Sequence, residues 1–386
     1  MSVFAWLLLS VPATALAVHL VSCLLAYLRF RKSPSAAPSV PRPGVSVIRP
    51  LCGLEPFSDE TLRSTFLIDY PEYEVIFCVA KSSDPILPLV RALLTAYPEQ
   101  RARVLIGEDA FSANPKLNNM AKGFRAACFE HIVFVDSNVF MPTHYLDDLA
   151  GLLSDGAGMV SAPPVGLAPD GFWAEVECAF LNSYQARIQY ALDSLGLGFA
   201  QGKTLCFRRA DLDHGGFARL ASEPAEDAAA TKMMRARGSR VRLAGPFPQL
   251  IGPRSASQVW KRQVRWARLR RASFPVLYMP EFLAGGLPPL LVLCAAVAAL
   301  GFDVTMPAMI FAAVWYMPEL LLVRAAGWPR TLPALLLRDA LLPAVYVAGL
   351  LGSSFEWHGH RMVTAPPAET RRWTLSGGLS KLRGFL

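Results

Sequence analysis

Residues 131–138 read HIVFVDSN, a continuous apolar run that ends on an acid and is followed by a serine and an asparagine. Apolar runs this short and this rich in β-branched residues are typical of strands buried on both faces of a sheet. Asp136 therefore stands at the carboxyl end of a predicted buried strand. In open α/β sheets, ligands bind beyond this end of the strands.

Similar runs occur on both sides of this stretch and are separated by segments with the periodicity of helices. The predicted strands are residues 45–49, 74–80, 103–107, 131–136 and 203–207, and the predicted helices between the first four are residues 57–67, 86–97 and 117–128. This alternation indicates an α/β, Rossmann-like domain with a parallel sheet. The chain has no P-loop and no GxGxxG motif, which argues against a kinase or a dehydrogenase.

The two ends of the chain are apolar. Hydrophobic residues make up 53% of the 386 residues and charged residues 18%, and the apolar excess lies in residues 4–28 and 274–355. Residues 1–28 carry no charge and are long enough to cross a bilayer. Arg29, Arg31 and Lys32 follow, which predicts a signal anchor with the middle of the chain in the cytosol. The competing interpretation, a signal peptide cleaved near residues 13–17, lacks a basic n-region.

The C-terminal third contains three apolar stretches, at residues 282–302, 306–323 and 332–355. The third is interrupted by Arg338 and Asp339. If all three crossed the membrane, the basic tail would lie on the side opposite to the one that the positive-inside rule favours. We therefore expect one stretch to be re-entrant or interfacial.

These features divide the chain into six parts. They are a transmembrane signal anchor (1–32), a Pro/Ser/Ala linker (33–44), a cytosolic α/β domain (45–257), a basic amphipathic interfacial region (258–281), transmembrane or re-entrant helices (282–355) and a tail (356–386). A net charge of +8 suits a protein that lies against anionic lipid headgroups. We therefore expect no nucleic acid partner. Composition leads us to expect a bacterial inner membrane.

Three motifs lie where the predicted strands end or the next helix begins. RPLCGLEP (residues 49–56) either forms a plain turn or brings backbone close to a nucleotide base. SSDP places Asp84 in the loop after the second strand, and NPKLNN (residues 114–119) precedes a helix. Asp136 and Asn138 offer oxygen ligands that suit a divalent cation bridging phosphates, although an acid at Asp136 is also typical of a turn or helix cap.

Two further motifs lie towards the membrane region. AEDA (residues 225–228) opens a predicted helix, where acids are common because of the helix dipole. WKRQVRWARLRR (residues 260–271) is typical of a basic helix at a bilayer surface, and its arginines also suit a diphosphate. Both interpretations can hold for one helix.

The order of these motifs resembles the ceramide glucosyltransferase family, membrane enzymes with a type-A glycosyltransferase domain. The resemblance covers residues 45–271 and rests on RPLCGLEP, SSDP, NPKLNN, VFVDSN, GKTLCFRRADLD, AEDA and the (R/Q)xxRW motif at residues 262–266. The chain departs from the family in reading Asp-Ser-Asn instead of Asp-x-Asp, and in having Arg49 where relatives often have lysine.

The resemblance implies transfer of a hexose, glucose from UDP-glucose, to the primary hydroxyl of ceramide or a related membrane lipid, with inversion. Asp227 would be the catalytic base. Asp136 and Asn138 would hold Mg²⁺ or Mn²⁺. The residues that would bind the UDP-sugar are Pro50, Gly53, Glu55, Asp84, Lys116, Asn118, Asp136, Arg262, Arg265 and Trp266. Residues 171–202 lie where relatives contact the acceptor.

Other functions stay open at this point. A hopanoid or other lipid glycosyltransferase, including one that transfers N-acetylglucosamine, would share the same motifs. A processive polysaccharide synthase shares the Arg-x-x-Arg-Trp motif, but its secretion channel needs more transmembrane helices than this chain offers. A transporter would carry its ionisable residues within several spans, whereas here they cluster in the middle of the chain. A scaffold with a degenerate catalytic domain would not need to retain all three candidate acids.

Overall fold

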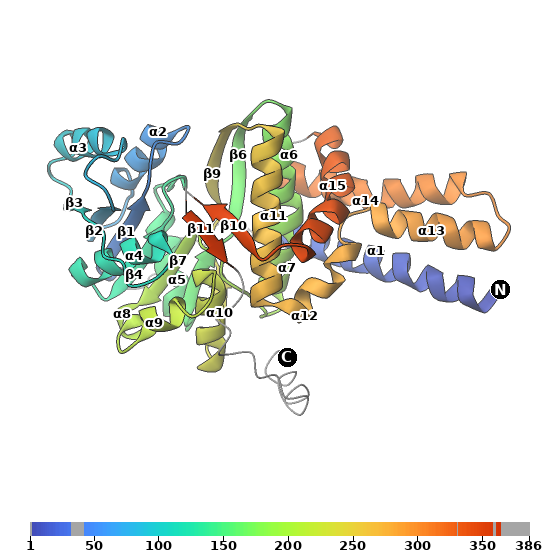
Figure 1. The fold of residues 1–386 in the computed structure, drawn as a ribbon, viewed down its shortest axis with the longest axis horizontal. Coiled ribbons are helices and arrows are strands. Elements are labelled where there is room, and N and C mark those ends of the chain that lie inside the picture. The colour runs from blue at the N-terminus through green and yellow to red at the C-terminus, as the bar shows by residue number, and fades with distance from the viewer. Residues whose placement is uncertain (1, 32–41, 330, 358–359, 364–386) are drawn as a thin grey trace.

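The computed structural model describes residues 2–31, 42–329, 331–357 and 360–363. A mixed α/β domain forms one half of the molecule, and helices from both ends of the chain form the other (Figure 1). Most of the predicted linker, and the predicted tail beyond residue 363, lie outside the described residues.

The main sheet has seven strands. In spatial order they are β3 (Ala102–Ile106), β2 (Tyr73–Val79), β1 (Val45–Leu51), β4 (His131–Val135), β7 (Thr204–Arg208), β5 (Met159–Ala162) and β8 (Val241–Leu243). The first four are parallel, as the sequence predicts. The prediction of a wholly parallel sheet is wrong for β7, which runs antiparallel to both β4 and β5. An apolar run shows that a strand is buried but not which way it points.

Helices cover both faces of this sheet. They are α2 (Ser58–Arg63), the 3₁₀ turn η1 (Ser64–Phe66), α3 (Leu87–Ala96), α4 (Pro115–Ala126), α5 (Tyr145–Ser154), α8 (Arg209–Leu212), α9 (Gly216–Leu220) and α10 (Glu226–Ala236). Neighbouring strand residues point to opposite faces, so Val47 packs in one hydrophobic core with α3 and α5, and Ile48 in another with α4 and α10. Burial on both faces explains why the strands read as continuous apolar runs.

A second layer joins the domain to the membrane-side helices. It contains β6 (Pro164–Asp170), β9 (Phe247–Pro253), α6 (Phe172–Ala179), the π-helical segment η2 (Phe180–Ala186), α7 (Arg187–Ser194) and α11 (Ala256–Ser273). β6 and β9 pair as a two-stranded parallel sheet. The Asn182 side chain bonds both backbone polar groups of Gly166, which fastens the π-helical segment to β6. α11 begins with a capping box between Ser255 and Gln258.

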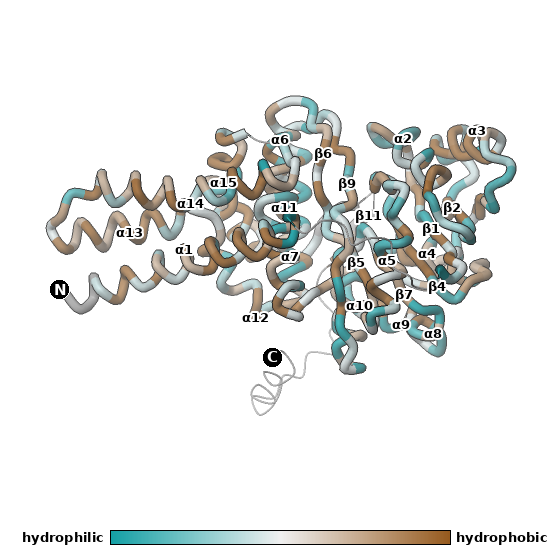
Figure 2. The backbone as a smooth tube through the Cα atoms, turned by 180° about the vertical axis from the view of Figure 1, so that it is seen from behind, coloured by the Kyte–Doolittle hydropathy of each residue, from teal (hydrophilic) through white to brown (hydrophobic). Residues whose placement is uncertain are grey.

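Three helices are long and apolar enough to cross a membrane: α1 (Ser2–Arg31), α14 (Thr305–Ala325) and α15 (Leu332–Leu350). A fourth candidate is a pair bent by 55°, in which α12 (Pro275–Tyr278) and η3 (Met279–Leu283) precede α13 (Leu287–Ala299). The apolar stretch at residues 282–302 is therefore bent and not one straight helix. Figures 1 and 2 show α1, α13 and α14 side by side, projecting from the body as an apolar bundle. The described chain ends in a hairpin of β10 (Ser354–Trp357) and β11 (His360–Val363).

Three charged residues inside α14 and α15 are paired with one another and buried. The Arg338 guanidinium contacts the carboxylate of Glu319, and its Nη2 lies 2.7 Å from Asp339 Oδ1. Tyr316 Oη donates to Asp339 Oδ2 at 2.8 Å. Charges at membrane depth are tolerated when they pair in the interior of a bundle, which explains how α15 accommodates an Arg-Asp pair.

Arg49 is fully buried at the end of β1 and organises the loop that follows β4. Its Nη2 donates to the carbonyls of Asp136 and Ser137, both at 2.9 Å, and of Val139 at 3.0 Å. Its Nη1 donates to the Thr61 carbonyl at 2.7 Å. Burial lowers the pKa of Arg49 to about 10, so the group stays charged at neutral pH. One side chain thus fixes the position of the acidic motif after β4.

Replacing Arg49 by methionine should destabilise the protein. Arg49→Met removes a hydrogen-bond donor from four carbonyls, of which those of Thr61 and Asp136 keep a second donor, and each buried group left unpaired costs about 1–3 kcal/mol. We expect the melting temperature of the purified protein in detergent to fall by about 5 °C or more. The matched control is Arg63→Met, which removes an exposed pair with Asp59 and should change little. Equal melting temperatures for the two variants would contradict the role given to Arg49.

Candidate active site

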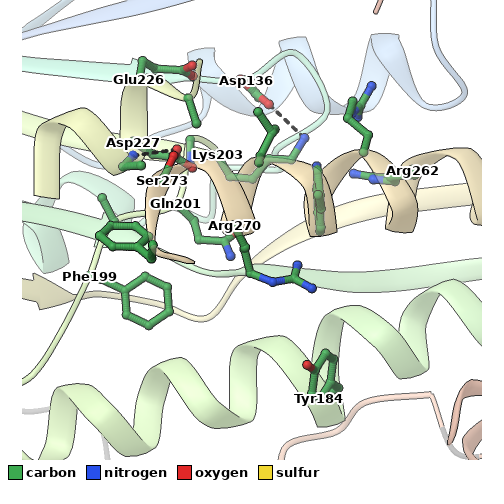
Figure 3. A pocket seen from close by; sticks show the side chains of 18 of the residues that line it. Asp136, Tyr184, Phe199, Gln201, Lys203, Glu226, Asp227, Arg262, Arg270 and Ser273 are labelled. Atoms are coloured by element: carbon green, nitrogen blue, oxygen red, sulfur yellow. Dashed lines mark hydrogen bonds and ion pairs between the residues drawn. The ribbon is translucent and has the colours of Figure 1, made fainter. Parts of the chain in front are cut away.

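One large cavity, of about 1690 Å³, lies beyond the carboxyl ends of β1, β2 and β4 (Figure 3). The loops after these strands form its floor with Pro50, Glu55, Asp84, Asp136 and Asn138. Residues 200–203, the start of α10, and α11 form other walls. Its position is the one that the predicted sheet indicates for a ligand.

Asp136 lies between two lysines. Its Oδ1 is 2.7 Å from Lys116 Nζ, and its Oδ2 is 2.8 Å from Lys203 Nζ. Burial alone would raise the pKa of this carboxyl, but the two ammonium groups outweigh it and hold the pKa well below its usual range. Asp136 is therefore an anion at any physiological pH.

Lys116 connects Asp136 to a second acid. Its Nζ lies 2.8 Å from Glu226 Oε1 and donates to the Gly202 carbonyl at 2.5 Å. Burial opposes its charge, but the ion pairs with both acids raise the pKa of Lys116. Asn114 caps α4 with its side-chain oxygen and donates from Nδ2 to Glu226 Oε2 at 3.0 Å. The helix that carries Lys116 is thus fixed against the start of α10.

Asp227 follows Glu226 in the first turn of α10, and its carboxyl has different partners. Its Oδ2 accepts from the Gly202 backbone N–H at 2.8 Å, and no lysine pairs with it among the described residues. Burial and the neighbouring charge of Glu226 raise the pKa of Asp227 to about 6. The carboxyl is therefore deprotonated at neutral pH yet basic enough to accept a proton, which is what a general base requires.

The predicted metal ligands Asp136 and Asn138 share a cation, and this cation is an ammonium. Lys203 Nζ lies 2.8 Å from Asp136 Oδ2 and 2.9 Å from Asn138 Oδ1. The Asn138 amide is oriented by its Nδ2, which donates to Glu55 Oε2 at 2.9 Å. Within the described residues, no three His, Cys, Asp or Glu side chains cluster as metal ligands. Mg²⁺ and Mn²⁺ are often held by one or two protein oxygens plus substrate phosphates, so the residues fit such an ion if Lys203 moves aside.

The other residues that are predicted to bind the UDP-sugar divide into two groups. Pro50, Glu55 and Asp84 line the cavity, and the Asp84 carboxylate accepts from the backbone N–H groups of Gly53 and Ile86. Gly53, which has a φ of +72°, does not line the cavity. It contributes to the site through the hydrogen bond from its N–H to Asp84. The structure places Asn118 beneath the site: it lines no part of the cavity and fastens the backbone of Ser112.

The arginines of α11 line the opposite wall. Arg262 contacts the fully buried Glu177, which also pairs with Arg254, and its guanidinium stacks on the Trp266 ring at 4.9 Å. Arg265 has no hydrogen bond or ion pair among the described residues, and burial followed by the charge of Arg262 lowers its pKa to about 10. Arg265 is therefore the arginine that is free to bind an anion.

Sequence reasoning missed two members of this site, Lys203 and Glu226. Lys203 is quoted within GKTLCFRRADLD without a role, and Glu226 within AEDA only as a neighbour of Asp227. Glu226 meets Lys116 across 110 positions of the chain, and Lys203 meets Asp136 across 67. A local sequence pattern cannot predict ion pairs between residues so far apart in the chain. The available sequence signal for Lys203 was its position directly before an apolar strand.

The chain is similar to known glycosyltransferases. The model of glycosyl transferase family 21 matches residues 11–367. Ceramide glucosyltransferase 3 of Caenorhabditis elegans is 26% identical over 89% of this chain and 77% of its own length. The ceramide glucosyltransferase of Komagataella phaffii is 37% identical, over 32% of this chain and 26% of its own length.

A solved structure shares the fold. The mannosyltransferase PcManGT from Pyrobaculum calidifontis, in complex with GDP-Man and Mn²⁺, matches 89% of this chain and 98% of its own with a TM-score of 0.54. Its sequence identity is 19%, so the similarity concerns the fold alone. It agrees with the type-A glycosyltransferase domain that the motif order implies.

Proposed function

The chain belongs to glycosyl transferase family 21, within which it is related to the ceramide glucosyltransferases, and we propose that it moves glucose from UDP-glucose onto the primary hydroxyl of ceramide or a related membrane lipid, with inversion. That it is a glycosyltransferase follows from the family and the fold. The donor, the acceptor and the stereochemistry are the proposal.

One observation carries the proposal: a single cavity reaches from the carboxylate–lysine cluster to the membrane-side helices. Asp136, Lys203 and Asp227 line one part of it, and residues of α1 and α12 line another. A site of this kind brings together a charged, water-soluble substrate and an amphiphile that approaches from the bilayer. This supports a lipid acceptor over a growing polysaccharide.

The cationic groups around Asp136 would hold the diphosphate of the donor. Burial lowers the pKa of Lys203 despite its ion pair with Asp136, so a further anion beside this ammonium would stabilise its charge. A phosphate would accept a charge-assisted hydrogen bond from it. Arg265 supplies an unpaired charge from α11. Asp84, Glu55 and Pro50 would line the nucleoside end.

Asp227 would take the proton of the acceptor hydroxyl. The acceptor oxygen then forms its bond to the anomeric carbon while the bond from that carbon to the diphosphate oxygen breaks, and UDP departs with the electron pair. Attack from the face opposite the leaving group inverts the anomeric centre. Lys203 and Arg265 stabilise the negative charge that develops on the departing diphosphate, an effect typically worth a few kcal/mol per group.

Mg²⁺ or Mn²⁺ belongs to the proposal as well, with Asp136 and Asn138 as its protein ligands. A bound divalent cation would neutralise the charge of the diphosphate. Lys203 competes for the same two oxygens, at 2.8 and 2.9 Å, and the diphosphate would draw this lysine away as the ion binds.

The division of the chain into six parts is also proposed. The mixed sheet lies within residues 45–257, and the three candidate spans lie in residues 1–32 and 282–355, which supports the division. The candidate spans suggest a membrane protein. The relatives named above come from a nematode and a yeast, so a bacterial inner membrane stays a prediction from composition.

The test of the function is a radiolabelled-donor assay with the purified full chain in lipid vesicles. UDP-glucose is offered with ceramide, and in parallel other UDP-sugars and other lipids are supplied. A glucosylated ceramide is the expected product. Transfer of another sugar or to another lipid would change the substrates, a polymer would favour the polysaccharide synthase, and no donor turnover would favour a degenerate scaffold.

Asp227→Asn should abolish turnover in this assay because an amide cannot accept the proton. We expect kcat to fall by about 10²–10⁴-fold, the usual contribution of a general base, with binding of UDP nearly unchanged by calorimetry. Asp155→Asn, on the exposed end of α5, is the matched control. Full activity of Asp227→Asn would rule out Asp227 as the base.

The pH dependence of sugar transfer should follow the protonation of the Asp227 carboxyl. A base must be deprotonated to act, so transfer should fall as the pH drops through about 6, the pKa of Asp227. The charge of Glu226 helps to raise that pKa, so Glu226→Gln should move the acidic limb to lower pH. The measurement is kcat/KM between pH 5 and 8. An acidic limb that stays in place in Glu226→Gln would contradict the coupling of the two acids.

Lys203→Gln should strengthen binding of Mn²⁺ in the absence of nucleotide, because the lysine no longer competes for Asp136 and Asn138. The measurement is the dissociation constant of Mn²⁺ by electron paramagnetic resonance, which does not depend on turnover. Lys232→Gln, which breaks a surface pair with Glu223, is the control. Weaker Mn²⁺ binding in Lys203→Gln would show that the lysine assists the ion instead of competing with it.

A further inference from the structure

The part of the cavity that faces the membrane has a wall made by α1. Ser10, Val11, Thr14, Ala15 and Val18 of this helix all line the cavity. Their spacing of one, three and four positions puts them on one face of a helix. α1 is also the first candidate membrane span. One face of a spanning helix therefore belongs to the same cavity as Asp227.

Other parts of the cavity lining near the membrane-side helices are also apolar. Leu192, Leu197 and Phe199 line the cavity from α7 and the loop that follows, and Phe274 and Leu277 line it from the end of α11 and from α12. Leu197 is 42% exposed and Leu277 is 56% exposed. Large apolar side chains that stay exposed inside a cavity indicate an apolar ligand.

The lining changes from apolar to polar within five residues. Phe199 lies on the apolar side, Gln201 follows, and Lys203 reaches Asp136. Figure 3 shows Phe199 and Gln201 between Asp227 and the helix that carries Tyr184. An amphiphile with its hydroxyl at Asp227 would therefore extend its hydrocarbon part past Phe199 towards α1.

We infer that α1 forms one wall of the binding site for the hydrocarbon chain of the acceptor and so helps to select the acceptor, in addition to any role as an anchor. The inference rests on the proposed function. It commits to one occupant, an acyl or sphingoid chain of a membrane lipid, because this wall spans the layer in which such chains lie. Thr14 lies in the middle of the stripe and Val18 at its C-terminal end, so bulk at either position should reduce how much chain fits.

Two pairs of variants of the full chain in nanodiscs test this. Thr14→Trp and Val18→Trp fill the cavity from α1, whereas Ala17→Trp and Leu24→Trp add the same bulk on exposed positions of α1 that do not line it. The assay compares ceramides with short and long N-acyl chains, and measures the KM of each acceptor and the release of UDP without acceptor.

For Thr14→Trp and Val18→Trp we expect KM for the long-chain ceramide to rise about tenfold or more, a loss of about 1.4 kcal/mol, with a smaller rise for the short-chain one. UDP release without acceptor should stay as in the unmodified protein, because the donor end is untouched. The control pair should match the unmodified protein with both acceptors. Equal effects in the two pairs, or no dependence on chain length, would overturn the inference while leaving the proposed function intact.

A labelling experiment checks the site without turnover. A photoactivatable ceramide with an alkyne tag, carried in vesicles, should label residues 10–18 of α1, and an excess of plain ceramide should suppress this label. Equal labelling of α1, α14 and α15 that plain ceramide does not suppress would overturn the inference. An unmodified protein that makes no glycolipid with any acceptor would instead overturn the proposed function, and the inference with it.

Discussion

The ammonium of Lys116 lies between the carboxylates of Asp136 and Glu226, at 2.7 and 2.8 Å, and this ion pair joins the two halves of the catalytic domain. Asp136 directly follows β4, which pairs with the antiparallel strand β7, and Glu226 opens α10, which packs on one face of that sheet. Three acids converge here, Asp136, Glu226 and Asp227, and without a lysine among them their mutual repulsion would open the site. Together with Lys203 it holds Asp136 as an anion, and its charge lowers the pKa of Asp227 without cancelling the rise that burial and Glu226 cause.

The rest of the site is arranged around this constraint. Arg49 fixes the backbone of the loop that carries Asp136, and Asn114 fixes Glu226 while capping the helix of Lys116. Gly202 stands between them: its carbonyl accepts from Lys116 and its N–H donates to Asp227. A Cβ at this position would lie 2.9 Å from Glu226 Oε1 and 3.1 Å from Lys116 Nζ, so a larger residue would displace the ends of both side chains.

Much of this arrangement could be predicted from local sequence. The strand expected at residues 74–80 is β2, Tyr73–Val79, and the helix expected at 117–128 begins two residues earlier because Asn114 caps it and Pro115 occupies its first turn. The direction of β7 could not be predicted, since burial leaves it undetermined. Arg49 looked like part of a turn although it holds a loop almost ninety positions away, and Asn118 looked like a ligand although it supports Ser112. Hydrogen bonds between distant segments leave no periodic trace in the sequence.

The packing of α1 has a consequence for how the protein is made. The Nε2 of His19 in α1 donates a hydrogen bond to the carbonyl of Trp315, 296 positions later in the chain, and Arg29 pairs with Asp193. The first helix to leave the ribosome therefore waits for a partner that is synthesised roughly 15–60 s afterwards, at about 5–20 residues per second. Until then α1, which lines one part of the cavity, lacks its contact with α14. A chain that ends before α14 would therefore lack the helix against which this wall of the cavity packs.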